Sequence, residues 1–309
     1  MGVVFSPVRA WAERPPGELT SALRHATVTA ASGAEGLLTP GEMFMPAFDV
    51  ECFRRLLRTR VLGQRCMVFE VLASTNTSLY TLGRQGDPEG TVVLADEQTA
   101  GRGQAGKVWI SPPGCNLYVS ALLRPAIVPA QAPQISLLAA VALVDTLRQE
   151  GAVCGIKWPN DVLIRRRKVA GVLTEMETHQ DAVRFVVVGI GINVNMTQEA
   201  LQDRLGSIAE SATSLRVALG LEVSRERLLA TLMERLEHWY DRFIADGKAV
   251  LQEAWEARSL MRGRRISAQT SGAILEGTAE GIDGTGRLQL RRNDGAMIAL
   301  TSAEVRFLD

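Results

Sequence analysis

Lys157-Trp-Pro-Asn-Asp161 is the stretch that decides the fold, together with Lys168-Val-Ala-Gly171 and Gly189-Ile-Gly-Ile-Asn193 further along the chain. The three segments adjoin short apolar runs, so each lies at the end of a predicted strand. Two lysines and an aspartate at strand ends suit phosphate-anhydride chemistry, because lysine neutralises charge on an α-phosphate or a carboxylate. The aspartate would hold a metal or accept a proton from an attacking amine. A lysine–aspartate pair with a purely structural role is the alternative.

Apolar periodicity around this stretch predicts strands and helices in mixed order. Asp49 is the predicted N-cap of a first helix, and Ser74-Thr75-Asn76 is predicted to open a second. The remaining predicted elements are helices at 133–147 and 225–244 and strands at 67–72, 91–95, 116–123, 156–158, 162–164, 169–175 and 182–194. Such an order predicts an α+β fold, a mixed sheet with flanking helices.

The texture of the sequence changes after about residue 262. Residues 264–308 form short alternating segments broken by glycines, and Asp283-Gly284 and Asn293-Asp294-Gly295 are hairpin signals. We therefore expect a main α+β domain over 48–261, to which the family resemblance described below assigns catalysis, and a small separate β-barrel over 262–309.

Residues 1–47 are rich in Ala, Ser, Thr, Pro and Gly, which predicts a poorly structured extension. The arginines within 1–46 also suit an organelle transit segment, although Glu13, Glu18 and Glu35 weigh against it because such peptides are poor in acid. A short regulatory element is a third possibility. We expect a cytoplasmic protein, with organelle targeting by residues 1–46 as the alternative.

Composition excludes several classes of protein. The chain has 309 residues with 34 Lys and Arg against 34 Asp and Glu, so it lacks the basic footprint of a nucleic-acid-binding protein. No apolar stretch approaches the roughly 20 residues that span a bilayer, and no membrane partner is expected. The cysteines, at 52, 66, 115 and 154, lack metal-ligand spacing, so four reduced thiols are expected and no zinc site.

Gly101-Arg-Gly-Gln-Ala-Gly106 formally matches a dinucleotide-binding fingerprint. That fingerprint requires a helix directly after the glycines, whereas Pro112-Pro113 and then a strand follow here, which excludes the assignment. Three glycines with Arg102 and Lys107 instead predict a mobile cationic flap that closes over anionic groups. An ordinary surface loop is the alternative.

Taken together, these motifs resemble those of the biotin protein ligases. The matching pieces are Ser74-Thr75-Asn76, the stretch 96–103, Trp109 with Ser111-Pro112, Asn116-Leu-Tyr118, and the three segments at 157–161, 168–171 and 189–193. The resemblance covers residues 48 to 308. It implies a class II synthetase-like mixed sheet with a C-terminal SH3-like barrel. It also implies that biotin and Mg²⁺-bound ATP form biotinyl-5'-adenylate, from which a lysine of a biotin carboxyl carrier domain receives biotin. Monomers and homodimers are both compatible with it.

The resemblance assigns roles to single residues. Lys168 would bind the biotin carboxylate and the α-phosphate, Arg102 would close over both, and Asp161 would help the acceptor lysine to lose its proton. The implied biotin-binding residues are Ser74, Thr75, Asn76, Gln98, Gly101, Arg102, Gly103, Gln104, Lys168 and Gly171, and the implied ATP-binding residues are Arg102, Gly106, Trp109, Lys157, Asn160 and Asn193. No metal site made by the protein alone is expected. For Trp109, Asn160 and Asn193 a packing role is the alternative.

Gln104 departs from the family pattern, in which many members carry a second basic residue in the flap. An uncharged side chain here would hold the adenylate less tightly, although Lys107 could compensate. The rival functions are a lipoate or octanoate ligase of related fold, a non-catalytic biotin sensor or DNA-binding repressor, and a pure interaction module. Residues 1–47 have too many Pro and Gly breaks for a convincing winged helix.

Overall fold

The computed structural model describes residues 48–309, apart from the side chain of Lys248. These residues belong to one compact unit, which begins at Ala47. The expectations for residues 1–47, a poorly structured extension or a transit segment, lie outside the described residues.

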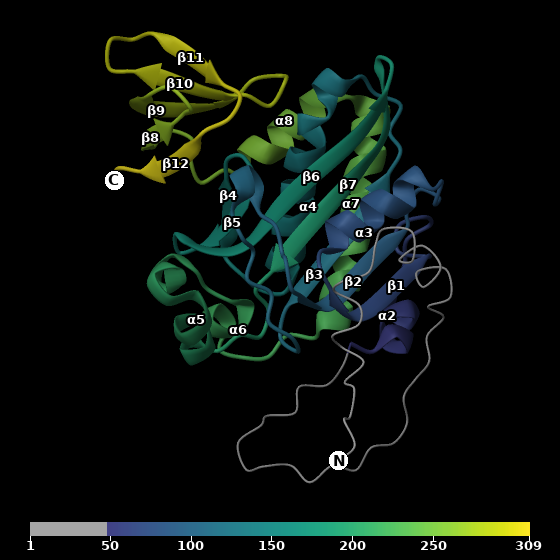
Figure 1. The fold of residues 1–309 in the computed structure, drawn as a ribbon. Coiled ribbons are helices and arrows are strands. Elements are labelled where there is room, and N and C mark those ends of the chain that lie inside the picture. The colour runs from purple at the N-terminus through teal and green to yellow at the C-terminus, as the bar shows by residue number, and fades with distance from the viewer. Residues whose placement is uncertain (1–47) are drawn as a thin grey trace, which may run out of the picture. The chain divides into compact units, whose positions relative to one another are not determined.

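The larger of two sheets has seven strands in the order β1-β2-β3-β7-β6-β5-β4 (Figure 1). Only β1 and β2 pair in parallel, and every other neighbouring pair is antiparallel, so the expected mixed sheet is confirmed. Its strands are β1 (Cys66–Leu72), β2 (Val92–Gln98), β3 (Leu117–Leu123), β4 (Cys154–Lys157), β5 (Asp161–Ile164), β6 (Arg167–His179) and β7 (Ala182–Ile192).

Helices cover both faces of this sheet. Val186 and Val188 of β7 join the apolar core with α4 (Pro133–Gln149), whereas Phe185 packs edge-on against Tyr80 of α3 (Thr75–Arg84). Because successive side chains of a strand point to opposite faces, α3 and α4 lie on opposite sides of the sheet. Behind α4 lies α7 (Arg225–Asp246), which also contacts α2 (Val50–Leu56). The predicted N-cap is confirmed, since Asp49 Oδ1 accepts from the Cys52 amide at 2.9 Å.

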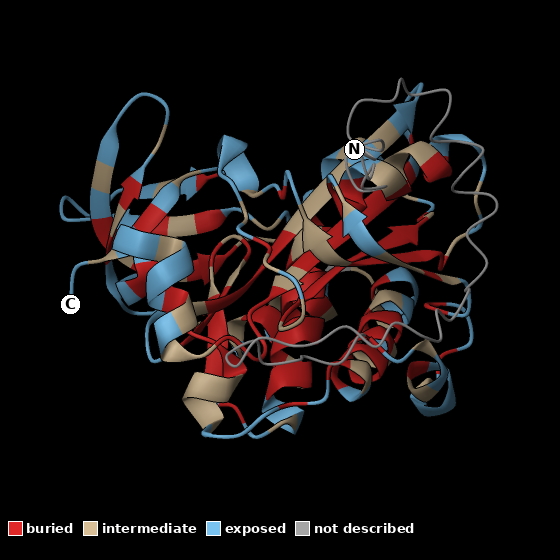
Figure 2. Ribbon diagram, turned by 60° about the horizontal axis from the view of Figure 1, so that its bottom comes forward, coloured by how far each residue is buried: buried red, intermediate tan, exposed pale blue. Residues whose placement is uncertain are grey.

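The expectation that no apolar stretch approaches membrane-spanning length was wrong. The segment Pro129–Gln149 is 21 residues long and apolar enough to cross a membrane by length and composition. Within it, 72% of the apolar 18-residue window is buried, because α4 packs between the sheet, α7 and α8 (Lys248–Glu256). Its hydrophobicity on all sides is that of a core helix, and Figure 2 shows buried residues concentrated in this layer and the sheet.

The C-terminal segment forms a five-stranded, all-antiparallel sheet in the order β11-β10-β9-β8-β12, which confirms the predicted β structure. Its strands are β8 (Arg265–Gln269), β9 (Ile274–Ile282), β10 (Leu288–Arg292), β11 (Met297–Leu300) and β12 (Glu304–Phe307). Trp158 Nε1 and Gln134 Nε2 of the larger part donate to the carbonyls of Gly286 and Gly284, at 3.0 and 3.1 Å. The two sheets share one apolar core, and the division at residue 262 stays a proposal.

Three short helices were not predicted: α5 (Gln198–Leu205), α6 (Leu215–Leu219) and α8. The first two have five to eight residues, too few for a clear helical period. Both are capped locally, because the side chains of Thr197 and Ser214 accept hydrogen bonds from the amides of Ala200 and Val217.

Candidate active site

Glycines form the floor of the site, on the α3 face of the large sheet. Gly171 of β6 pairs with Gly191 of β7, and Gly189 lies two residues along the same strand. A Cβ on Gly191 would lie 2.5 Å from Trp109 Cε2, and one on Gly189 would lie 2.0 Å from Asn76 Oδ1. Glycine is therefore needed at both positions, because Trp109 and Asn76 approach the strand backbone more closely than any side chain allows.

A ladder of hydrogen bonds forms one wall. Ser120 Oγ donates to Asn76 Oδ1 at 2.6 Å and shares a second hydrogen bond with the Thr75 hydroxyl, at an Oγ–Oγ1 distance of 2.8 Å. The backbone amide of Thr75 donates to Gln98 Oε1, and Gln98 Nε2 donates to Ser111 Oγ at 2.9 Å. Ser74 is the N-cap of α3 as predicted, although its side chain makes no capping bond. These polar groups are held rigidly at the end of α3, ready to orient a polar ligand head.

The glycine-rich segment is a short hairpin that carries positive charge over this floor. The amide of Gly103 donates to the Lys107 carbonyl at 2.6 Å, and that of Trp109 to the Gly101 carbonyl at 2.9 Å. Arg102 pairs with Glu175 of β6 at 2.5 Å, and Lys107 with Glu304 of β12 at 3.0 Å. The helix that a dinucleotide fingerprint requires is replaced by a turn of 3-10 helix, and the next element is the strand β3, which confirms the exclusion.

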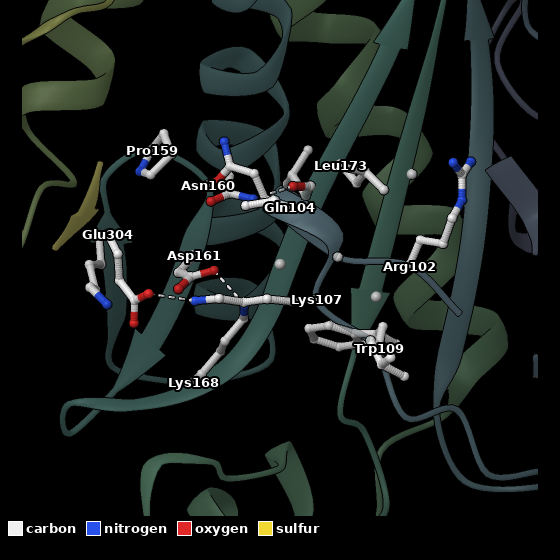
Figure 3. A pocket seen from close by; sticks show the side chains of 18 of the residues that line it. Arg102, Gln104, Lys107, Trp109, Pro159, Asn160, Asp161, Lys168, Leu173 and Glu304 are labelled. Atoms are coloured by element: carbon white, nitrogen blue, oxygen red, sulfur yellow. Dashed lines mark hydrogen bonds and ion pairs between the residues drawn. The ribbon is translucent and has the colours of Figure 1, made fainter. Parts of the chain in front are cut away.

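Lys168 and Asp161 lie side by side in the cavity (Figure 3), and the charges of both act on Lys157. Lys168 Nζ lies 2.5 Å from Asp161 Oδ1 across the β5–β6 pair, and 5.2 Å from the centre of a Trp109 ring. Burial lowers the pKa of Lys157; the Lys168 charge lowers it further, while Asp161 opposes both. A weakly hydrated lysine beside a second lysine is a strong attractor for phosphate oxygens, because an anion would relieve both the desolvation and the repulsion.

These features surround a cavity of about 710 Å³, which is within the usual range for small-molecule sites. Fourteen of the sixteen predicted site residues line it: Ser74, Thr75, Asn76, Gln98, Arg102, Gly103, Gln104, Trp109, Lys157, Asn160, Asp161, Lys168, Gly171 and Asn193. Gly101 and Gly106 do not. A Cβ on Gly101 would meet the Trp109 carbonyl at 2.3 Å, so this glycine closes the base of the hairpin. Gly106 has φ +75° and forms the exposed turn.

Asn160 and Asn193 line the cavity and also brace its walls. Asn160 Nδ2 donates to the Val172 carbonyl at 2.6 Å, and Asn193 Nδ2 to the Thr213 carbonyl at 3.0 Å. Both side chains are buried. The packing role considered for them is therefore real, and it is compatible with contact to a ligand through the remaining oxygen.

Sequence reasoning missed the part of the lining that comes from distant segments. Ser271, Ser302 and Glu304 reach the cavity from the C-terminal sheet, and Ile208 from the turn after α5. No local pattern marks these residues, because their position depends on how the second sheet packs. Trp158 is the one sequence feature that partly indicates this packing, since its buried indole donates a hydrogen bond from the deciding motif to Gly286 of that sheet.

Carboxylates are sparse in the cavity. Among residues 48–309 no group of three or more His, Cys, Asp or Glu side chains is arranged to hold a metal ion. Asp161 and Glu304 are the acidic residues of the lining, each paired with a lysine. The site is thus a cationic, glycine-floored cavity under a basic hairpin, suited to binding an acid together with a nucleotide.

Residues 68–193 match the model of the biotin/lipoate A/B protein ligase family, and residues 263–308 match that of the biotin protein ligase C-terminal domain. The bifunctional ligase/repressor BirA of Bacillus subtilis (strain 168) is 40% identical over 240 residues, 77% of this chain and 73% of that protein. A biotin–[acetyl-CoA-carboxylase] ligase of Paracoccus denitrificans is 38% identical, over 70% of this chain and 89% of that protein.

Among solved structures, the biotin protein ligase of Aquifex aeolicus in complex with biotin and ATP matches with a TM-score of 0.67. Its identity is 26%, over 79% of this chain and 99% of that chain. Fold and site thus define an acid-activating ligase. The chain belongs to the biotin protein ligase family, as its motifs indicated.

Proposed function

We propose that this protein is an ATP-dependent biotin ligase, which forms biotinyl-5'-adenylate and then transfers biotin to a lysine of a biotin carboxyl carrier domain. The observation that carries the proposal is the Lys168–Asp161 pair beneath the basic hairpin, in the cavity of a chain whose relatives are biotin ligases. The C-terminal match to a biotin protein ligase domain favours biotin over lipoate or octanoate.

In the first step, a carboxylate oxygen of biotin attacks the α-phosphorus of ATP, and pyrophosphate leaves. We assign Lys168 to the carboxylate and α-phosphate, Arg102 to the closing flap, and Lys157, Asn160, Trp109 and Asn193 to the nucleotide. The polar wall of Thr75, Asn76 and Gln98 suits the ureido head of biotin, since it offers both donors and acceptors. Charge neutralisation by fixed lysines supplies most of the rate.

In the second step, the neutral amine of the acceptor lysine attacks the acyl carbon, and AMP leaves with the electron pair of the anhydride bond. Asp161 is the residue that we assign to accept the amine proton, because it lies at the cavity beside Lys168. The hairpin shields the anhydride from water until the acceptor arrives. No covalent enzyme intermediate is required.

Mg²⁺ would enter with the nucleotide. This ion is commonly held by one or two carboxylates together with substrate phosphates, and Asp161 fits that description. The partner that we propose is the carrier domain of a biotin-dependent carboxylase, in the cytoplasm, with the enzyme as a monomer or homodimer. We expect no nucleic-acid partner, although some relatives are named ligase/repressors, and failure of the protein to shift DNA in a gel would agree with this expectation.

The first test is ATP–pyrophosphate exchange with biotin, lipoate and octanoate as the acid. We expect exchange with biotin alone, and a loss of about a hundredfold or more in Lys168→Ala, because one fixed transition-state donor is removed. Arg167→Ala is the matched control. Arg167 precedes Lys168 in the chain, and its side chain is exposed and makes no ion pair within the described residues.

Each outcome of the exchange assay has a different meaning. Exchange with lipoate or octanoate instead of biotin would support the proposed adenylation chemistry and show that the acid substrate is not biotin. Near-normal exchange in Lys168→Ala would overturn the assigned site. No exchange with any acid would favour the non-catalytic biotin sensor.

A further inference from the structure

Glu175 of β6 stands outside the cavity lining but contacts two residues within it. Its Oε2 accepts from Asn76 Nδ2 at 2.9 Å and from an Arg102 guanidinium nitrogen at 2.5 Å. Asn76 belongs to the rigid wall, whereas Arg102 belongs to the basic hairpin. One carboxylate oxygen therefore joins the hairpin to the wall of the site.

The wall side of this junction has almost no freedom. Asn76 is buried, accepts from Ser120 at 2.6 Å, donates to the Leu173 carbonyl at 3.1 Å, and lies against the backbone of Gly189. Glu175 is itself set in the middle of a paired strand, opposite Val187. Because both residues are held by the sheet, a group bound to Glu175 is held relative to the sheet as well.

The hairpin has two ion pairs, and they are unequal. The side chains of Arg102 and Glu175 are 44% and 28% exposed, against 63% and 48% for Lys107 and Glu304. Exposed ion pairs contribute little, because water screens them and ordering two long side chains costs entropy. The Arg102–Glu175 pair also gains from the second hydrogen bond to Asn76, which pre-orders the carboxylate. Within residues 48–309 Arg102 makes no other ion pair.

We infer that Glu175 is a positioning residue that latches the hairpin over the active site through Arg102. This inference rests on the proposed function, and it adds a residue to which no role was assigned. When the hairpin is latched, the adenylate is shielded from water and retained. Without the latch the hairpin opens more often, so the adenylate is lost before the acceptor lysine arrives.

The test compares Glu175→Gln with Glu177→Gln. Glu177 is two residues along the same strand, and it also pairs with an arginine, Arg84 at 3.7 Å, but outside the cavity. Labelled biotinyl-adenylate would be formed on each enzyme and chased with unlabelled biotin, and its loss followed with time. We expect loss to be about tenfold faster in Glu175→Gln, the effect of one charge-assisted hydrogen bond, and unchanged in Glu177→Gln.

Two further measurements separate a latch from a structural role. The KM values for biotin and ATP in pyrophosphate exchange should stay near wild type, because the carboxylate touches neither substrate. In an Arg102→Gln background, Glu175→Gln should add no further loss, because both changes break the same contact. Glu175→Asp keeps the charge at shorter reach; it should give an intermediate rate, and it replaces the Gln variant should that fail to fold.

The inference is overturned if Glu175→Gln and Glu175→Asp both retain biotinyl-adenylate as long as wild type does. It is also overturned if Glu175→Gln accelerates adenylate loss as much in the Arg102→Gln background as in wild type, or if Glu177→Gln accelerates it as much as Glu175→Gln does. Failure of the proposed function looks different: wild-type enzyme would then form no adenylate with biotin at all.

Discussion

At the scale of single residues, the site depends on glycines, which have no side chain, as much as on its charged groups. The indole of Trp109 lies directly on Gly191 and beside Lys168. A Cβ on Gly171 would lie 3.3 Å or less from both of these side chains. The aromatic ring lies 5.2 Å from Lys168 Nζ, and it packs the base of the hairpin against the floor. Small residues here are therefore part of the binding geometry.

Gly191→Ala should displace Trp109, because the new Cβ would lie 2.5 Å from Cε2 of the ring. We expect the KM for biotin to rise by about tenfold or more, as a displaced ring disturbs both floor and hairpin. Steady-state exchange kinetics measure this. Gly272→Ala is the control, since a Cβ there has nothing within 4 Å, and similar KM values for the two variants would argue against the close packing.

Gln104 lines the cavity without a charge. Gln104→Arg should slow the loss of biotinyl-adenylate by about tenfold, because a charge-assisted hydrogen bond to a phosphate oxygen becomes available. Gln104→Met, of similar length and uncharged, should not slow it. Identical off-rates for wild type and the arginine variant would overturn the prediction that the uncharged Gln104 weakens adenylate binding.

At the scale of elements, turns hold the strands in register, and the β9–β10 turn is the clearest case. Asp283 Oδ1 accepts from the amides of Thr285 and Arg287, at 2.9 and 3.0 Å. Burial alone raises the pKa of Asp283, but hydrogen bonds from Thr285 and Arg287 outweigh it and lower the pKa to about 2. The turn also presents the Gly286 carbonyl to Trp158, so it joins the two sheets.

A depressed carboxyl pKa stabilises the folded state above the ordinary value of 3.8, and the effect is lost as pH falls toward about 2. Asp283→Asn should therefore cost about 1–2 kcal/mol of unfolding free energy at neutral pH, and the difference in unfolding free energy from wild type should narrow as pH falls from about 4 toward about 2. Urea unfolding at each pH measures this. Asp294→Asn, at a side chain that accepts from one backbone amide instead of two, should show a smaller difference from wild type.

At the scale of the whole molecule, the second sheet is part of the active-site body. Trp158 lies inside the deciding motif, is buried, and donates to Gly286, while Met261 Sδ accepts from its amide at 3.0 Å. Glu304 of the second sheet forms an ion pair with Lys107 of the hairpin. The C-terminal segment therefore both shapes the cavity and supports the strand ends that bear Lys157 and Asp161.

Because both sheets share one core, residues 48–309 should unfold in a single transition, with near- and far-ultraviolet circular dichroism coincident. Trp158→Phe keeps most of the packing and removes the indole hydrogen bond, so it should lower stability by about 1 kcal/mol. Two separated transitions in the wild type would show that the sheets are independent. Trp11→Phe, outside the described residues, serves as the spectroscopic control.

Much of the fold was predictable from local patterns. Strand and helix periodicity depends on near neighbours, so the seven strands of the large sheet, α4 and α7 were all expected from their sequences. Short helices such as α5 and α6 were not, because their capping bonds and tertiary contacts, rather than a period, stabilise them.

The sequence by itself determined the chemical types of the site: two lysines, an aspartate, a basic glycine hairpin and a polar helix start, each recognisable within a few residues. Only the tertiary structure decided which charges meet. Asp161 faces Lys168, Arg102 faces Glu175, and Lys107 faces Glu304, across separations from 7 to 197 residues. The physical reason is that local conformation depends on adjacent residues, whereas ion pairs depend on sheet register and on how the second sheet packs.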